Sequence, residues 1–150
     1  MKIWQEDQLS ALSNLSSEQE IFNEVKRLAS NLGFDYCAYG LRIPLAIAVP
    51  KVIMLNNYSE DWQRTYAEKN YFIGDPTVKH CMHSLQPIIW TDPLFNSARD
   101  LWEDATSYGL KHGWVQSCRD ANGAQGMLTL ARSGESISDS EMKSNYLEMF

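Results

Sequence analysis

The sequence predicts an α+β fold in which helices cover an antiparallel sheet, and three observations support this prediction. Short runs rich in aromatic and β-branched residues occur in pairs, and the turn 120–123 joins one such pair as a hairpin. Segments with apolar residues at helical spacing lie between these pairs. The 150 residues contain no repeat and no linker rich in Pro, Gly or Ser, so we expect one domain over residues 1–150.

The first part of the chain predicts a helix followed by two strands. Apolar residues recur at helical spacing after an acidic first turn, and Gly33 is a natural stop for this helix. Residues 34–41 and 51–55 are short and rich in aromatic or β-branched side chains, which is typical of strands. Pro44 and Pro50 are expected to bracket a loop or an irregular edge between the two strands.

The remaining elements begin at recognisable capping residues. Asn57 is expected to cap a helix that carries aromatic side chains at i, i+4 and i+8. Asp75-Pro76 predicts a helix up to about Leu85, because a capping acid precedes Pro at the first helical position. The other expected elements are a strand at 88–90, a helix over 98–109, strands over 114–119 and 126–132, and a helix that begins at the capping box 138–141.

Composition and charge exclude several classes of protein. The chain is 44% apolar and 21% charged, and no apolar run approaches the ~20 residues that a membrane helix needs. The net charge of -6 argues against nucleic-acid binding by this chain alone, because phosphate binding requires clustered positive charge. The three cysteines lack zinc-type spacing and the N-terminus is not typical of a signal peptide, so we expect a reducing, cytoplasmic compartment.

The densest chemical signal lies between Asn57 and Trp90. Tyr58 and Trp62 are one helical turn apart and can donate hydrogen bonds, whereas an ionised Asp75 only accepts them. Such a set fits a ligand that offers two carbonyl oxygens and one amide N–H. An aromatic stripe is more often core, and Asp before Pro is more often only a cap. A carboxylate held at a helix N-terminus is nevertheless positioned to accept a further bond.

These residue types and spacings form one pattern over about residues 20–145. Its members are Tyr58, Trp62, Tyr66, Asp75-Pro76, Pro87, Trp90, residues 32–36, Leu101-Trp102, Ala105, residues 108–110, Gly113 and residues 126–130. The pattern resembles the autoinducer-binding domain of LuxR-type quorum-sensing regulators, and most closely the solitary receptors, which lack a dedicated signal synthase. The resemblance implies an α-β-α sandwich with a five-stranded antiparallel sheet, similar to GAF and PAS domains. It also implies an N-acyl homoserine lactone buried between the sheet and one helical layer.

The resemblance further implies a role for each residue of the ligand site, with no catalytic residue, metal or cofactor. Trp62 would donate to the lactone carbonyl, Asp75 would accept from the ligand amide N–H, and Tyr58 would donate to the amide carbonyl. Thr129 would face the same polar head. The expected walls are Trp90 and Trp102 for the lactone ring, and Tyr66, Val78, Leu110 and Met127 for the acyl chain.

The sequence also departs from the family pattern. Ser59 stands where the family most often has Pro, and Ala38 where some relatives have a polar residue. The C-terminal helix-turn-helix domain of the family is absent from this chain, so we expect DNA binding only of a parent protein. The last predicted helix stops in the middle of its apolar stripe, so we expect the chain to be the front part of a longer protein, with a naturally short protein as the alternative. Family members dimerise, so we expect a homodimer whose fold the ligand stabilises, with no membrane contact.

Other readings of the sequence remain. His80 and His83 share a helix face, but two ligands do not complete a metal site. Cys81 has no evident base or oxyanion hole, and Asp75 with His80 is a candidate acid–base pair. A GAF/PAS-like sensor for another apolar molecule is the main alternative. A receptor without its DNA-binding half, which blocks full-length partners by heterodimerisation, is another.

Overall fold

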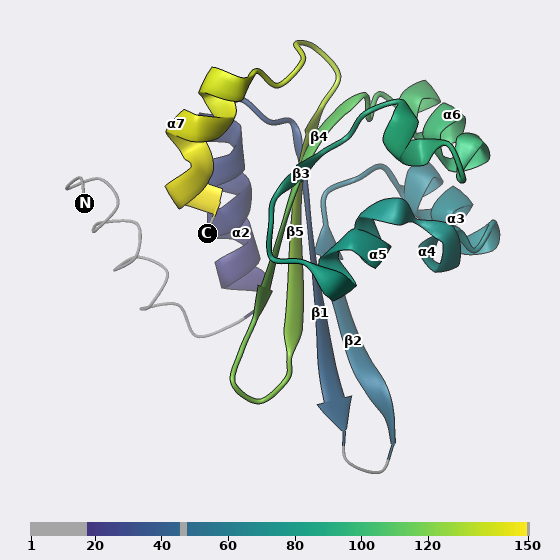
Figure 1. Cartoon of the computed structure of the whole chain (residues 1–150), viewed down its shortest axis with the longest axis vertical. Helices are drawn as coiled ribbons and strands as arrows, with labels where there is room; N and C mark the ends of the chain where they lie inside the picture. The colour runs from purple at the N-terminus through teal and green to yellow at the C-terminus, as the bar shows by residue number, and fades with distance from the viewer. Residues whose placement is uncertain (1–17, 46–47, 150) are drawn as a thin grey trace.

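Five antiparallel strands form one sheet, in the order β2-β1-β5-β4-β3, in the computed structural model, which describes residues 18–45 and 48–149. The strands are β1 (Tyr36–Leu45), β2 (Ala48–Asn56), β3 (Ile88–Ile89), β4 (His112–Arg119) and β5 (Gln125–Arg132). The helices are α2 (Glu18–Asn31), α3 (Glu60–Glu68), α4 (Tyr71–Gly74), α5 (Pro76–His83), α6 (Arg99–Ser107), α7 (Asp139–Met149) and the 3-10 helix η1 (Pro93–Phe95). Helices α2 and α7 cover one face of the sheet and α3 to α6 lie on the other, which confirms the predicted sandwich (Figure 1).

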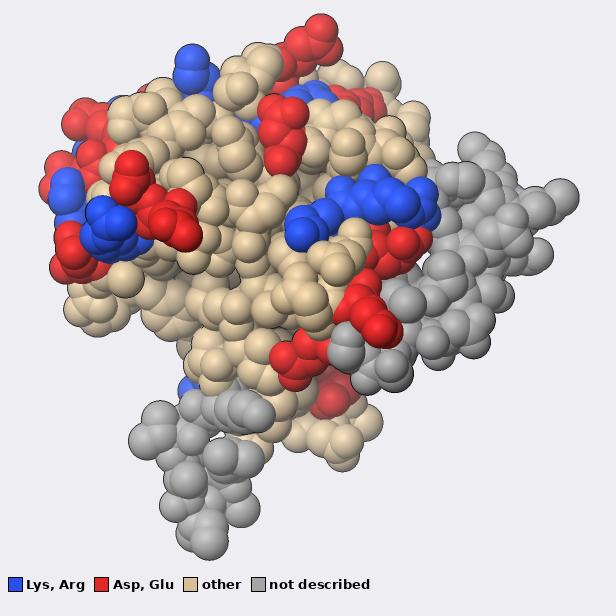
Figure 2. All heavy atoms as spheres, turned by 180° about the vertical axis from the view of Figure 1, so that it is seen from behind, with Lys and Arg blue, Asp and Glu red and all other residues tan. Residues whose placement is uncertain are grey.

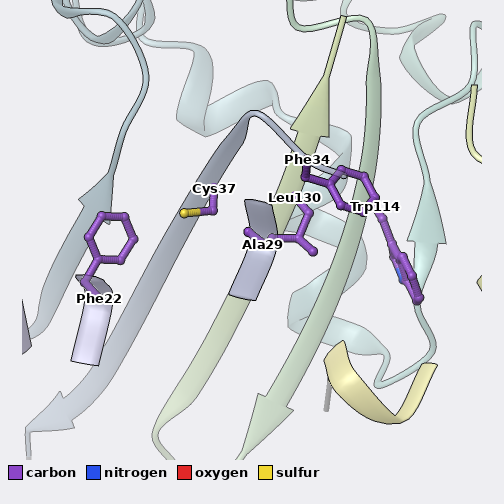
Figure 3. Close-up of a cluster of buried hydrophobic side chains, with 6 residues drawn as sticks. All are labelled: Phe22, Ala29, Phe34, Cys37, Trp114 and Leu130. Atoms are coloured by element: carbon purple, nitrogen blue, oxygen red, sulfur yellow. The ribbon is translucent and has the colours of Figure 1, made fainter. Parts of the chain in front are cut away.

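An apolar core joins α2 to the sheet. Phe22 and Ala29 of α2 are buried together with Phe34, Cys37, Trp114 and Leu130, as Figure 3 shows. The helix ends as predicted at Gly33, whose φ of 88° lies in the left-handed region that favours glycine. This face of the sheet therefore carries an apolar core between α2 and the strands.

An ion pair fastens α7 to the same layer. The guanidinium of Arg132 donates to both carboxylate oxygens of Glu141, at 2.6 and 2.7 Å. The hydroxyl of Ser138 accepts from the backbone N–H of Glu141, as the capping box predicts. The hydrogen bond from Arg132 holds the pKa of Glu141 below its ordinary value of 4.5.

The hairpin β1–β2 is longer than predicted. Pro44 lies inside β1 and Pro50 inside β2, on either side of residues 46–47, which are outside the described residues. The ladder to β5 ends at Arg42, so Pro44 lies beyond it, and the register between β1 and β2 is irregular between Ile43 and Leu45. Strand β2 is an edge strand, so it has a neighbouring strand on one side only. The missing backbone N–H of Pro50 can therefore interrupt pairing on that side alone. The irregular register beside Pro44 agrees with the predicted irregular edge, and the alternative, a loop between the two prolines, falls on residues 46–47 outside the described residues.

One predicted helix cap was wrong. Ser59, and not Asn57, caps α3, because its hydroxyl accepts from the backbone N–H of Trp62 at 3.2 Å. Asn57 instead accepts from the backbone N–H of Cys37 at 2.7 Å and donates to the carbonyl of Asp35. It thereby ties the end of β2 to the start of β1. The short helices α4 and η1 were not predicted at all.

The surface has no continuous basic area on the side that Figure 2 shows. Lys and Arg side chains are interspersed there with Asp and Glu among the described residues. This distribution fits the net charge of -6. Of the part of the chain that the structure describes, no helix is long and apolar enough to cross a bilayer.

Candidate ligand-binding site

A cavity of about 630 Å³ lies between the sheet and the layer of α3 to α6. Its size is within the range of small-molecule sites. All ten residues that the sequence predicted for a ligand site line it: Tyr58, Trp62, Tyr66, Asp75, Val78, Trp90, Trp102, Leu110, Met127 and Thr129. Segments up to 71 residues apart in the chain thus meet at one cavity, although their individual roles stay predictions.

The sheet supplies the floor of the cavity. Successive side chains of a strand point to opposite faces, so alternate residues of β1 and β5 face the same side. Ala38, Gly40 and Arg42 of β1 line the cavity, as do Met127 and Thr129 of β5. Neither Gly40 nor Arg42 was predicted, because the sequence alone does not reveal which face of β1 the cavity occupies.

Asp75 lies at the centre of a hydrogen-bond network. Its side chain caps α5, where Oδ1 accepts from the backbone N–H of Thr77 at 2.9 Å and from its hydroxyl at 2.7 Å. The hydroxyl of Tyr66 donates to Oδ2 at 2.8 Å. The predicted cap is therefore confirmed. Tyr66 lines the cavity as expected, and its polar contact was missed because the sequence does not show how far α3 lies from α5.

Four side chains that line the same cavity carry a donor without a hydrogen-bond partner among the described residues: Tyr58, Trp62, Trp90 and Thr129. Trp62 and Thr129 are only 4% and 5% exposed, and Tyr58 is partly buried. Within the described residues, nothing accepts from the indole N–H of Trp62, and nothing bonds the hydroxyls of Tyr58 and Thr129. Burial, reinforced by the nearby Asp75 charge, raises the pKa of Tyr58 well above its ordinary value, so the phenol keeps its proton. Unpartnered buried donors are costly, and a ligand with carbonyl oxygens would satisfy them.

Aromatic rings wall one side of the cavity. Phe95 packs edge-on against Trp90, with ring centroids 6.2 Å apart, and lies 4.8 Å from the ring of Trp102. The ring of Trp90 lies directly over Gly113 of β4, where an added Cβ would be 2.2 Å from a ring atom. Gly113 is thus required for this wall, since any larger residue would displace the indole.

Polar contacts join α6 and the residue after it to the segment of α3 and α4 near Trp62. The carboxylate of Asp104 on α6 accepts from Lys69 at 2.7 Å and from the hydroxyl of Tyr71. The hydroxyls of Thr65 and Tyr108 are 3.1 Å apart. No sequence signal pointed to this contact of α3 and α4 with α6, because the partners are more than 30 residues apart and polar.

The structure also bears on the catalytic and metal readings. Cys81 lines the cavity, but burial raises its pKa to about 11, so the thiol is protonated at neutral pH. His80 lies outside the cavity lining, and its Nε2 is 2.8 Å from the carbonyl oxygen of Gln86. No group of three or more His, Cys, Asp or Glu residues that could hold a metal occurs among residues 18–45 and 48–149. The site therefore offers hydrogen bonds and apolar contact, with neither a thiolate nor a metal cluster in the part described.

Comparison with known proteins identifies the family of this chain. Residues 17–150 match the protein family described as Autoinducer binding domain. The chain is 53% identical to the transcriptional activator protein AnoR of Acinetobacter nosocomialis, over 100% of this chain and 64% of AnoR. It is 32% identical to the regulatory protein SdiA of Escherichia coli K12, over 86% of this chain and 54% of SdiA. The chain thus spans less than two thirds of each of these relatives.

Solved structures show the same fold. A crystal structure of Escherichia coli SdiA matches with a TM-score of 0.87 and 29% identity, covering 97% of this chain and 61% of that chain. SdiA in complex with octanoyl-rac-glycerol matches with a TM-score of 0.84 and 30% identity, with the same coverage. Fold, cavity and sequence similarity lead to one conclusion: the chain belongs to the autoinducer-binding domain family of LuxR-type quorum-sensing regulators.

Proposed function

We propose that the cavity binds an N-acyl homoserine lactone and that the polar residues of the cavity form hydrogen bonds with the lactone and amide groups of this ligand. In this proposal Trp62 donates to the lactone carbonyl and Tyr58 donates to the amide carbonyl. Asp75 accepts from the amide N–H, and Thr129 faces the same head. The observation that supports the assignment is the placement of the unpartnered donors Tyr58 and Trp62 on the same cavity as the Asp75 carboxylate.

The network around Asp75 leaves room for a ligand. A carboxylate offers about four lone-pair sites. Thr77 uses two of them on Oδ1 and Tyr66 uses one on Oδ2. A ligand N–H can take the remaining site, and the bonds already present hold the carboxylate in one orientation for it. We infer that Tyr66 and Thr77 are positioning residues for the ligand contact.

The apolar remainder of the cavity suits an acyl chain. Each methylene removed from water contributes about 0.8 kcal/mol, so the chain supplies much of the affinity while the head sets the ligand class. A ligand that binds only the folded domain also stabilises it by mass action. The domain is therefore expected to fold or persist poorly without its signal.

A titration with matched ligands tests the proposal. Purified protein is titrated with an N-acyl homoserine lactone and, in parallel, with the ring-opened acyl homoserine, while tryptophan emission and the melting temperature are followed. The lactone should change both signals. The ring-opened compound should change neither, because it places a second carboxylate near Asp75. Equal effects of both compounds, or of an unrelated apolar metabolite, would support a general apolar sensor instead.

The ligand is bound and not consumed in this proposal. Cys81 is a protonated thiol, and Asp75 is engaged by Tyr66 and Thr77. We therefore expect prolonged incubation with the protein to return the lactone with its ring and amide intact. Faster ring opening with protein than with buffer alone would indicate an enzyme.

We also propose partners for the full-length protein. Relatives of this chain are named as transcriptional activators, and the chain spans only part of their length. We infer that the parent protein binds DNA through a region outside residues 1–150 and that this domain forms a homodimer when it holds its ligand. Light scattering on the domain should give twice the chain mass with lactone present, and a monomer at every lactone concentration would contradict the dimer.

A further inference from the structure

The mouth of the cavity lies where its lining reaches the surface, on β2, α4 and α5. Four apolar residues line the cavity and are also between 41% and 52% exposed: Val52, Met54, Phe72 and Met82. The donors proposed for the ligand head are far less accessible, since Trp62 and Thr129 are buried. A ligand therefore has to pass this mouth, of which α4 forms one side, before its head reaches the polar residues.

Helix α4 is held in place by few contacts. It has only four residues and follows Asn70, whose φ of 58° lies in the left-handed region that residues other than glycine seldom adopt. Ile73 is 70% exposed, and Phe72 is also exposed. Among residues 18–45 and 48–149, no backbone hydrogen bond joins α4 to the sheet. A short helix with exposed side chains and few bonds to the sheet is expected to move separately from its neighbours.

The side chain of Tyr71 anchors α4 to the helices beside it. Its ring lies near the rings of Trp62 and Tyr66 on α3, with centroids 6.3 and 6.0 Å apart. Its hydroxyl donates to Oδ2 of Asp104 on α6, and the same oxygen accepts from Nζ of Lys69 at 2.7 Å. These hydrogen bonds hold the pKa of Asp104 below its ordinary value of 3.8, so the carboxylate is charged at neutral pH. The two donors come directly before and after residue 70, so one carboxylate fixes both sides of the turn into α4.

We propose that Asp104 is a latch, whose bonds with Lys69 and Tyr71 hold α4 at the mouth of the cavity and whose opening sets the rate of ligand entry and exit. This inference rests on the proposed function and extends it from binding to exchange. The side chains of Lys69 and Asp104 are 55% and 29% exposed, so water can replace these bonds when α4 moves. Exposed ion pairs are weak, which allows such a latch to open in solution.

The latch predicts a characteristic change in kinetics. It holds the mouth closed both with and without ligand, so weakening it increases the fraction of open molecules in both states. Association and dissociation then become faster by the same factor, and the dissociation constant stays nearly the same. A residue that only shapes the ligand site would change the dissociation constant instead.

Thiol labelling tests the latch without any ligand. Cys81 is buried and lines the cavity, whereas Cys37 is buried in the core on the other face of the sheet. Burial raises the pKa of both thiols to about 11, so a difference in their labelling rates reports access. The protein is incubated with iodoacetamide, and mass spectrometry of its peptides gives the rate at each cysteine. Asp104→Ala should raise the rate at Cys81 about tenfold and leave the rate at Cys37 unchanged.

The labelling experiment also contains its own control for reactivity. Cys118 is exposed, so its rate should be the same in the wild type and the variant. An unchanged rate at Cys81, or an equal rise at Cys81 and Cys37, would overturn the latch, because the second result indicates unfolding of the whole domain.

Stopped-flow mixing with a lactone tests the consequence for exchange. N-dodecanoyl homoserine lactone (the dodecanoyl lactone) is mixed with the protein, and tryptophan emission gives the association and dissociation rate constants. Asp104→Ala should raise both by about tenfold, which corresponds to about 1.4 kcal/mol and to the loss of a hydrogen bond to a charged group. The dissociation constant should change by less than about threefold.

Two further variants make the test specific. Tyr71→Phe removes one bond of the latch but keeps the ring beside Trp62, so both rate constants should rise by less than in Asp104→Ala. Glu103→Ala is the matched control, because Glu103 is an exposed acid of α6 that lies outside the cavity lining. Among the described residues, it has no hydrogen bond with α3 or α4, so its replacement should leave both rate constants unchanged.

The outcomes separate the latch from the proposed function. Unchanged rate constants in Asp104→Ala, or a rise in the dissociation rate constant alone, would overturn the latch while lactone binding stays in place. Failure of the dodecanoyl lactone and of shorter lactones to bind the wild-type protein would overturn the proposed function, and the labelling of Cys81 would still decide whether the latch opens.

Discussion

Replacing Asp75 by Asn tests the head site with little change in shape. Asn caps a helix about as well as Asp, so α5 should keep its N-terminus. The amide oxygen can still accept from Thr77, whose backbone N–H lies 2.9 Å from Oδ1. The position of Oδ2 then carries the NH2 group of the Asn side chain, whose donors face the N–H of the ligand amide. The variant therefore replaces an acceptor by a donor without opening a cavity.

The size of the effect follows from the bond that is lost. A hydrogen bond to a charged group contributes about 1.5–3 kcal/mol, which corresponds to about 10- to 150-fold in the dissociation constant. Titration of tryptophan emission with the dodecanoyl lactone measures this change, and circular dichroism checks that the fold is kept. Asp61→Asn is the control, because Asp61 is an exposed acid on α3 that forms an ion pair with Arg64 and does not line the cavity. A folded Asp75→Asn variant that binds within threefold of wild type would refute the role of the carboxylate.

Three further predictions concern stability. Lactone at 100 times its dissociation constant should add about 2.7 kcal/mol, which corresponds to a rise of about 5–10 °C in melting temperature. Gly113→Ala should lower the unfolding free energy by about 1–3 kcal/mol, measured in urea, because the new Cβ overlaps the ring of Trp90. Glu141→Gln should cost about 1.5–3 kcal/mol at pH 7 by weakening the contact with Arg132. Because the pKa of Glu141 is lowered in the folded state, this difference exists above its ordinary value of 4.5 and vanishes as pH falls through the folded pKa.

Each of these measurements has a control. An unrelated fatty amide at equal concentration should leave the melting temperature unchanged, and an equal rise would count against a specific site. Gly134→Ala should be nearly neutral where Gly113→Ala is not, since its Cβ meets no atom within 4 Å. Glu68→Gln removes an exposed carboxylate of α3 and should leave the unfolding free energy at pH 7 nearly unchanged. A Glu141→Gln penalty that persists at pH 2 would contradict the ion-pair explanation.

The elements of the fold could largely be predicted from local signals. Asp75-Pro76 and Ser138 to Glu141 carry capping chemistry within four residues, and the structure has both helix starts. The helix cap predicted at Asn57 was wrong, because an Asn that caps a helix and an Asn that bonds a neighbouring strand look alike in sequence. Helix α4 has only four residues, which is too short for any periodicity to appear.

The sequence predicted the cavity-lining residues that form a spacing pattern. It did not predict the features that depend on how the strands and helices pack against one another. The aromatic and acidic residues around Trp62 and Asp75 were found through their spacing. The opening above Gly40 and the ring over Gly113 depend on strand register, which pairs residues up to 95 positions apart. The bond between Tyr66 and Asp75 likewise depends on how α3 packs against α5.

The indole N–H signals in a proton–nitrogen NMR spectrum test the central claim most directly, because each tryptophan reports on its own surroundings. Assignments come from single Trp→Phe variants, and the wild-type protein is titrated with the dodecanoyl lactone. We expect the signal of Trp62 to move most, because its N–H would donate to the lactone carbonyl. Trp114 is fully buried on the other face of the sheet, so its signal should stay in place. A Trp62 signal that does not move at saturating lactone would contradict the hydrogen bond from Trp62 to the ligand.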